Sequence, residues 1–368
     1  MSAGALAGLR VLDAASLYAA PFVATLLADH GADVVKIEPP GGDPYRHYPN
    51  RMWPLLARGK RSVELDLRDP AGRAELRRLA ADADVIVVNL PPATLAERGL
   101  DYDTLSAGNP GLIMVAVTGF GLDGPYRDRP GNGTLGEAYA GLTHMTGDPD
   151  GHPILPSVPL GDAITGLTGA FGVLAACYHR LAHGGTGQLI DVNPVDALLQ
   201  VGGPIHTEYD GTGEPPIRQG GRLSGSVVRN VFPTADGQWV AISASTPRHL
   251  ADLAALAGHD DHDENGRPRG DVEAALRRWT SARSRDEIIK ELVARRLPVA
   301  PVQTARDVRE DPHVMARGSL TTIVTAEQGP VCGPVAMPRL TGTPAPVRTR
   351  TADPGEHNAE VLRPVEDR

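Results

Sequence analysis

The chain contains few cysteines and few aromatic residues. Its 2 cysteines, Cys177 and Cys332, are spread over 368 residues, so neither a disulfide framework nor a cysteine-based zinc site is expected. The 12 histidines are scattered as well. The one mixed run of His, Asp and Glu, at 259–264, is more typical of a solvated loop than of a metal site. We therefore expect no metal and no resident cofactor.

Signals for several protein classes are also missing. No window holds eighteen apolar residues, so no membrane span is expected. Residues 1–10 lack the basic start and apolar core of a secretory signal, which favours a cytoplasmic location. The net charge of −9 argues against a general nucleic-acid binder. Because there is no G-x-G-x-x-G after the first strand pattern, no P-loop and no G-x-S-x-G elbow, dinucleotide, kinase and conventional hydrolase chemistry lose their main support.

The length and the alternation of patterns predict an α/β protein of two domains. Short runs rich in Val and Ile alternate with helical periodicity through the first half, which is typical of a parallel sheet buried on both faces. A stretch rich in Gly, Pro and Arg follows, and then a hairpin pattern and several helices. The predicted division is a large Rossmann-like domain at 1–210, a linker at 211–226, a small α+β domain at 227–325 and a C-terminal segment at 326–368.

The stretch 155–180 stands out because an acidic residue opens a long apolar helix pattern. Asp162 follows a proline-rich segment, and apolar residues then recur at three- and four-residue steps. The simplest interpretation of such an Asp is a helix N-cap. Gly161 and Gly166, however, permit close approach of backbone or ligand. A carboxylate fixed at a partly desolvated helix start is also suited to act as a nucleophile.

Two further motifs carry open alternatives. Lys60 and Arg61 are adjacent cations before a strand pattern; such pairs are usually solvated, but they also suit the phosphates of a nucleotide-like ligand. Asn89 follows a strand pattern, where open α/β sheets bind ligands, and it is equally suited to forming a turn.

Taken in order, these motifs resemble the family III CoA-transferases, the group that includes formyl-CoA transferase, carnitine CoA-transferase and the α-methylacyl-CoA racemases. The most direct match is Pro159-Leu-Gly-Asp-Ala-Ile-Thr-Gly166, and the resemblance reaches from Gly8-Leu-Arg-Val-Leu-Asp13 to Gly355-Glu-His-Asn358. It implies a Rossmann-like large domain, a small domain, a C-terminal segment that returns to the large domain, and an interlocked homodimer.

The resemblance also implies roles for individual residues. Asp162 would be the catalytic carboxylate, and coenzyme A would enter as a co-substrate. The implied CoA contacts are Ser16, Leu17, Lys60, Arg61, Asn89, Leu90 and Arg98, and the implied substrate contacts are Tyr18, Asn132 and Gly161.

The chain departs from the family pattern at several places, among them Glu97, where the family often has a basic residue, and Gly133, where many members have an acidic one. Tyr18 stands where the formyl-CoA transferase type has Gln, and the glycine run that covers the active site in that type is reduced to Gly220, Gly221 and Gly225. Asn132 stands where the racemases have His, so one base of a two-base proton exchange is missing.

The function predicted on this basis is CoA transfer from an acyl-CoA to a carboxylic acid, through an acyl anhydride and then a CoA thioester on Asp162. The backbone amides of Gly161 and Ala163 are the predicted oxyanion donors. An acyl-CoA racemase or epimerase and a non-catalytic CoA-binding protein are the alternatives. The predicted partners are small molecules and a second copy of the chain, with no nucleic acid and no membrane.

Overall fold

The computed structural model describes residues 4–49, 51–223, 228–261, 263 and 270–362. The chain divides into two compact units, which are described separately. The larger comprises 1–143, 155–213 and 313–368, and the smaller comprises 144–154 and 214–312. This division differs from the predicted domains in assigning 144–154 to the smaller unit and 313–325 to the larger.

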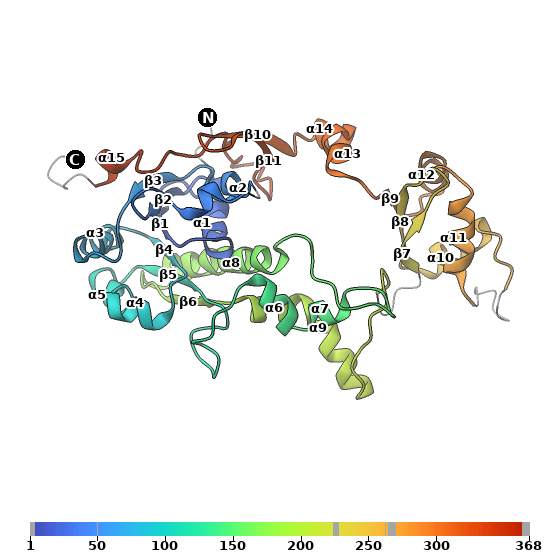
Figure 1. The fold of residues 1–368 in the computed structure, drawn as a ribbon, viewed down its shortest axis with the longest axis horizontal. Coiled ribbons are helices and arrows are strands. Elements are labelled where there is room, and N and C mark those ends of the chain that lie inside the picture. The colour runs from blue at the N-terminus through green and yellow to red at the C-terminus, as the bar shows by residue number, and fades with distance from the viewer. Residues whose placement is uncertain (1–3, 50, 224–227, 262, 264–269, 363–368) are drawn as a thin grey trace. The chain divides into compact units, whose positions relative to one another are not determined.

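A six-stranded parallel sheet forms the centre of the larger unit (Figure 1). Its strand order, β3-β2-β1-β4-β5-β6, is that of the doubly wound Rossmann fold, so the predicted parallel α/β sheet is confirmed. The strands are β1 (Arg10–Ala14), β2 (Asp33–Glu38), β3 (Arg61–Glu64), β4 (Val85–Val88), β5 (Ile113–Val117) and β6 (Leu189–Val192).

Helices cover both faces of this sheet, which explains why the central strands are continuously apolar. One core cluster packs α1 (Ala19–Asp29) and α8 (Leu160–His183) against one face. The other cluster includes residues from four helices on the opposite face. They are α3 (Pro70–Ala81), α4 (Pro92–Arg98), α5 (Tyr102–Gly108) and α15 (Asn358–Val361).

Helix α8 turns its small residues inward. A Cβ at Gly166 would lie 2.7 Å from the ring of Phe22, and one at Gly169 would lie 2.7 Å from a methyl group of Val23. Helices α1 and α8 therefore approach too closely for larger side chains at these positions. The large apolar residues of α8 face outward instead, which differs from the buried stripe that the periodicity predicts; Leu167, Phe171, Leu174, Tyr178 and Leu181 are all exposed.

By length and composition, α8 is also the one helix in the described ranges that is apolar enough to cross a membrane. Its inner side packs against α1 and the sheet. One such helix is weak evidence for a membrane span.

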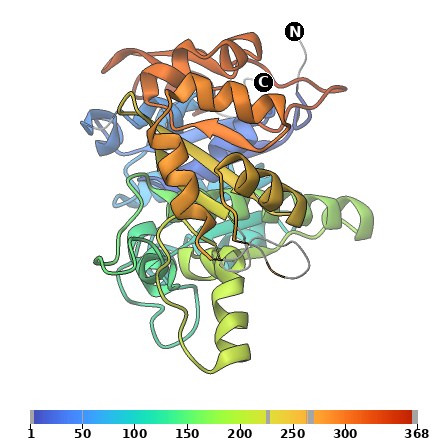
Figure 2. The ribbon, with the colours of Figure 1, turned by 90° about the vertical axis from the view of Figure 1, so that its right-hand side faces the viewer.

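The smaller unit contains an antiparallel sheet in the order β7-β8-β9, with helices packed against it (gold to orange in Figure 2). The hairpin predicted after the linker joins its first two strands, with Asp236 and Gly237 in the turn. The elements are β7 (Val228–Pro233), β8 (Trp239–Ala244), α10 (Pro247–Leu256), α11 (Val272–Ser281), α12 (Arg285–Ala294) and β9 (Val299–Pro301). Part of the 259–264 run lies outside the described residues.

The C-terminal segment packs on the larger unit. The His357 amide donates to the Ser62 carbonyl at 2.9 Å, and the Asn358 side chain accepts from the Glu64 amide at 2.9 Å, so α15 is held beside β3. Upstream, β10 (Leu320–Thr325) and β11 (Gly329–Pro334) form a hairpin. The remaining elements are η1 (Pro44–His47), α2 (Trp53–Ala57), α6 (Gly133–Tyr139), α7 (Leu142–Met145), α9 (Pro194–Thr212), α13 (Ala305–Glu310) and α14 (Pro312–Ala316).

Candidate functional site

The candidate site lies where the strand order of the sheet reverses. Strands β1 and β4 are neighbours, and the chain leaves their carboxyl ends through Ser16 and Asn89. The Asn89 side chain accepts from the Ser16 amide at 3.1 Å and donates to the Ser16 carbonyl at 2.8 Å. It thereby ties the two loops together beyond the ends of the strands. In doubly wound sheets this reversal is the usual place for a ligand.

A cavity of about 490 Å³ opens at this position in the larger unit. Its lining combines the loop after β1, the start of α1, the segment around η1 and the starts of α6 and α8. The predicted site residues among its lining are Ser16, Leu17, Tyr18, Asn89, Asn132 and Asp162.

Asp162 is the third residue of α8, because the helix begins at Leu160. It is therefore not the N-cap, a position held by Pro159. Its Oδ1 accepts a hydrogen bond from the Gly133 amide of α6 at 3.1 Å. A Cβ at Gly133 would lie 2.5 Å from the carboxyl carbon of Asp162, so only glycine permits this approach. The Asp162 carboxylate is thus half-buried at the cavity wall and held by a neighbouring element.

The surroundings of Asp162 make its carboxylate more basic than an ordinary aspartate. Burial raises its pKa, the Gly133 hydrogen bond lowers it, and the nearby charge of Glu137 raises it further, with a net increase. Tyr18, which also lines the cavity, has its pKa raised by burial and by the charge of Asp162. A more basic carboxylate is a stronger nucleophile.

Glu137 on α6 was not predicted as a site residue. It is 2% exposed, and its Oε1 accepts from the Gly161 amide at 2.7 Å. The Ala163 amide donates to the Pro159 carbonyl at 3.0 Å. The predicted oxyanion donors Gly161 and Ala163 are therefore both occupied, and this part of the sequence-based interpretation is wrong. No motif in the sequence marks Glu137, because its importance arises only from the packing of α6 on α8.

The start of α1 offers other backbone donors. Ala19 and Ala20, in its first turn, line the cavity, and amides in a first helical turn have no acceptor within the helix. Leu17, just before them, has a φ of 67°, in the left-handed region that a leucine rarely adopts. Such strain is characteristic of functional loops.

Three tyrosines and a methionine form one wall of the cavity. Tyr45 and Tyr48 stack with ring centroids 5.0 Å apart, and Tyr18 and Met52 complete the wall. Among the described residues that line this cavity, none is Lys, Arg or His. The wall was missed at the sequence level apart from Tyr18, because the segment after Pro39 has no regular pattern.

Lys60 does not line the cavity. Its ammonium group is buried, with hydrogen bonds of 2.7 Å to Asp13 and 2.7 Å to the Pro21 carbonyl. Burial lowers the pKa of Lys60 to about 8, against the raising effect of Asp13. The Lys60 ammonium group, which was expected to bind a CoA phosphate, is thus already bonded to groups within the protein.

Other predicted contacts also lie outside the cavity lining. Arg61 forms ion pairs with Asp33 at 2.6 Å and Glu360 at 2.8 Å. Leu90 packs in a core cluster, and Arg98 ends α4. The structure therefore does not bring these three predicted CoA contacts together with Asp162.

Two of the predicted substrate contacts have structural partners of their own. Asn132 lines the cavity and also caps α6, accepting from the Leu135 amide at 3.1 Å. Gly161 is buried beneath the cavity, where a Cβ would lie 2.5 Å from the Gly133 carbonyl oxygen. Of the reduced glycine run, Gly220 and Gly221 belong to the smaller unit, and Gly225 lies outside the described residues.

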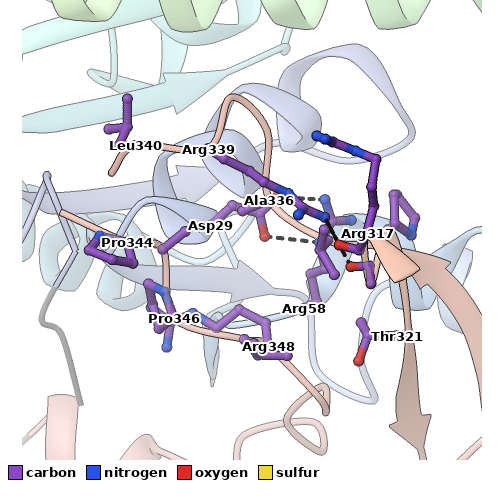
Figure 3. A pocket seen from close by; sticks show the side chains of 15 residues that line it. Asp29, Arg58, Arg317, Thr321, Ala336, Arg339, Leu340, Pro344, Pro346 and Arg348 are labelled. Carbon is purple, nitrogen blue, oxygen red and sulfur yellow. Dashed lines mark hydrogen bonds and ion pairs between the residues drawn. The ribbon is translucent and has the colours of Figure 1, made fainter. Parts of the chain in front are cut away.

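A second cavity, of about 260 Å³, is lined by Asp29 at the end of α1, by Arg58 after α2 and by residues of the segment 317–348 (Figure 3). Two of the arginines that line this cavity form contacts that stabilise the fold. Arg58 binds both carboxylate oxygens of Asp29, at 2.9 and 2.6 Å, and Arg348 donates to the Ala28 carbonyl at 3.0 Å. The first contact ties the end of α2 to α1, and the second ties the C-terminal segment to α1. Within the described ranges, no cluster of three or more His, Cys, Asp or Glu residues is arranged to hold a metal ion.

Comparison with known proteins places this geometry in context. The model of CoA-transferase family III matches residues 6–358. The succinyl-CoA–D-citramalate CoA-transferase of Chloroflexus aurantiacus is 35% identical over 370 residues, covering 96% of this chain and 92% of that protein. The succinyl-CoA–L-malate CoA-transferase beta subunit of the same organism is 37% identical over 380 residues, covering 98% and 94%. A solved CaiB/BaiF family protein from Brucella suis has a TM-score of 0.86 at 31% identity, covering 98% of this chain and 99% of that one.

Proposed function

Because the chain belongs to CoA-transferase family III, and is thus an enzyme that moves CoA between acids, we propose that Asp162 carries this transfer through covalent intermediates. The observation that supports the role most directly is the Asp162 carboxylate, held at the wall of the cavity by Gly133, with its pKa raised. An immobilised and more basic carboxylate is a suitable nucleophile toward a thioester.

In the first half of the proposed reaction, an Asp162 oxygen attacks the thioester carbonyl carbon, and the carbon–sulfur bond breaks to release CoA thiolate. The thiolate then attacks the Asp162 carboxyl carbon of the resulting anhydride and releases the donor acid as its carboxylate. The acceptor carboxylate reverses the two steps: it attacks the aspartyl-CoA thioester and gives a new anhydride, from which the thiolate takes the acyl group. No net proton is consumed.

The tetrahedral oxyanions need donors other than Gly161 and Ala163. We assign this role to the first amides of α1, at Ala19 and Ala20, because these residues line the same cavity as Asp162. Their position also places the positive end of the α1 dipole at the cavity. Leu17, with its left-handed backbone conformation, lies in the loop that leads into this helix.

The racemase alternative has less support. Asn132 has no ionisable group, and it is already engaged as the cap of α6. Tyr18 lines the same cavity as Asp162, but its raised pKa disfavours the phenolate that would accept a proton. A non-catalytic role is likewise disfavoured, because the cavity beside Asp162 is open and not collapsed.

For donor and acceptor, the names of the relatives make succinyl-CoA the first choice. The wall formed by Tyr18, Tyr45, Tyr48 and Met52 favours less polar acyl groups as well. Both classes therefore belong in a substrate panel.

A homodimer is part of the proposal. The outward face of α8 presents apolar side chains with exposures of 73% for Phe171, 72% for Tyr178 and 84% for Leu181. Contiguous apolar surface of this kind is characteristic of an interaction site. We assign it to a second copy of the chain, in the interlocked arrangement that the family resemblance implies.

The direct test is intact-protein mass spectrometry after mixing with a panel of acyl-CoAs, using hydroxylamine or borohydride as a trap. We expect a trapped product at Asp162 in the wild type and none in Asp162→Ala. CoA exchange should fall by about three orders of magnitude or more in the variant, while CoA binding is retained. If every CoA ester binds and none gives an adduct, covalent transfer is wrong and proton-transfer chemistry becomes the better hypothesis.

A further inference from the structure

Two hydrogen bonds of opposite direction join the start of α8 to α6. The Gly133 amide donates to Asp162 Oδ1 at 3.1 Å, and the Gly161 amide donates to Glu137 Oε1 at 2.7 Å. Each helix thus supplies one backbone donor and one side-chain acceptor. Two contact points fix both the position and the rotation of the first turn of α8, and therefore the direction of the Asp162 carboxylate.

These two hydrogen bonds do not by themselves explain why residue 137 carries an ionisable carboxyl group. Its side chain is 2% exposed, and within the described part of the chain it forms no ion pair. A neutral amide side chain would accept the Gly161 hydrogen bond without the cost of burying a carboxylate. The fold therefore tolerates a charge that the hydrogen bond does not need.

We propose that Glu137 is a positioning residue for the proposed transfer: through the Gly161 amide it fixes the first turn of α8, and its carboxylate lies behind Asp162, where its charge acts on the nucleophile. This inference rests on the function proposed above.

The chemical advantage lies in the energies of the intermediates. Each step exchanges a carboxylate and the CoA thiolate at an acyl carbon, so the reaction proceeds best when the aspartyl intermediates lie close in energy to the substrate thioester. A strongly acidic aspartate would be a weak nucleophile and would give a high-energy thioester. A negative charge close behind Asp162 opposes this by making its carboxylate resemble an ordinary carboxylic acid.

The other ionisable groups around Asp162 are few. The charge of Glu137 acts on Asp162 from α6, and Tyr18 faces it from the start of α1. Tyr45 and Tyr48 also line the cavity. Among the described residues, Glu137 is the ionisable neighbour whose charge raises the pKa of Asp162, so its replacement by an uncharged side chain tests this effect directly.

The test compares the wild type with Glu137→Gln. Glutamine retains an oxygen acceptor for the Gly161 amide, so the variant should fold with a similar melting temperature. Removal of the negative charge lowers the pKa of Asp162, and the acidic limb of the pH–rate profile should move to lower pH by about 0.5 to 1 unit. We expect kcat at the optimum to fall roughly tenfold, with little change in KM, because the group acts on the nucleophile and not on the substrate.

Two further variants separate the effect of the hydrogen bond to the Gly161 amide from the effect of the Glu137 charge. Glu137→Ala removes both, and should lower the melting temperature as well as kcat. Glu273→Gln is the matched control, since Glu273 is another buried carboxylate, in the smaller unit, where it accepts from Arg222 and Asn230. This control should leave the pH–rate profile unchanged.

A readout that does not depend on transfer activity keeps the inference separate from the proposed function. Carbodiimide labelling requires a protonated carboxyl group, so its pH dependence at Asp162, followed by peptide mass spectrometry, reports the pKa of that residue. A lower midpoint in Glu137→Gln supports the inference even if no CoA ester proves to be a substrate. A midpoint identical to that of the wild type overturns it, whatever the activity of the enzyme.

Discussion

Lys60 and Arg61 show how the surroundings of a residue decide its role. The two cations are adjacent in sequence, yet the Lys60 ammonium is enclosed by Asp13 and a main-chain carbonyl, whereas the Arg61 guanidinium lies nearer the surface. From the sequence, both are equally suited to a phosphate. In the structure, Lys60 neutralises a carboxylate that is itself fully buried at the end of β1.

We therefore predict that Lys60→Met lowers the free energy of unfolding by about 3 kcal/mol, because it leaves the buried charge of Asp13 without its closest partner. Arg61→Met should cost less than about 1 kcal/mol, since its ion pairs are partly solvated. Urea denaturation measures both values. A Lys60→Met protein of unchanged stability but weakened CoA binding would contradict this and support the phosphate role.

Comparison of the wild type with Lys60→Met at several pH values provides a second test. The pKa of Lys60 is lowered to about 8 in the folded state, so above that pH the folded chain binds fewer protons than the unfolded chain. Stability then rises with pH until the unfolded lysine also loses its proton. The gap in unfolding free energy between the wild type and Lys60→Met should accordingly widen between pH 8 and pH 10.

At the scale of elements, one side chain aligns the two loops that open the cavity. Strands β1 and β4 end side by side, and Asn89 extends their pairing by bonding both backbone groups of Ser16. The loop after β1 leads directly into α1, so this contact controls the orientation of the amides assigned to the oxyanion.

We predict that Asn89→Ala raises KM for the acyl-CoA about tenfold and changes kcat less, as expected if the loops form the CoA site. Steady-state kinetics with CoA as a competitive ligand provide the measurement. Asn109→Ala is the matched control, because Asn109 also bonds two backbone groups, the carbonyls of Ala80 and Ala83, without lining the cavity. Equal effects of the two variants on KM would show that Asn89 acts only through stability.

At the scale of the whole molecule, the outward face of α8 carries the prediction of a dimer. Its large side chains are exposed because its small ones are needed against α1. Burial of these apolar side chains therefore requires a surface outside the larger unit.

Phe171→Glu is expected to weaken the dimer, since it places a charge in the centre of this face, where burial of an unpaired charge is costly. Sedimentation velocity at several concentrations measures the change. Val293→Glu, at an apolar residue of the smaller unit that is 58% exposed, is the control and should leave the sedimentation coefficient unchanged. A monomeric wild type would refute the assignment of this face to a second copy.

Much of this architecture follows from local sequence patterns. The runs Val85–Val88 and Ile113–Val117 are strands because continuous β-branched and apolar residues suit a sheet covered on both faces. Helix α3 begins at Pro70, because Asp69 caps it and a proline suits its first position. Asp162 could likewise be singled out from its place before a long apolar helix.

The sequence by itself thus determined the order of strands and helices and the class of fold, and it singled out Asp162 as the predicted nucleophile, because these depend on periodicity, capping and short motifs. Only the tertiary structure decided that Glu137 lies behind the first turn of α8, that Lys60 is buried against Asp13, and that α8 turns its large residues outward. Each of these depends on how closely elements distant in sequence pack together. The elements can pack this closely because positions such as Gly133 and Gly166 have no Cβ. A local sequence pattern shows where a glycine stands, but not which distant element will pack against it.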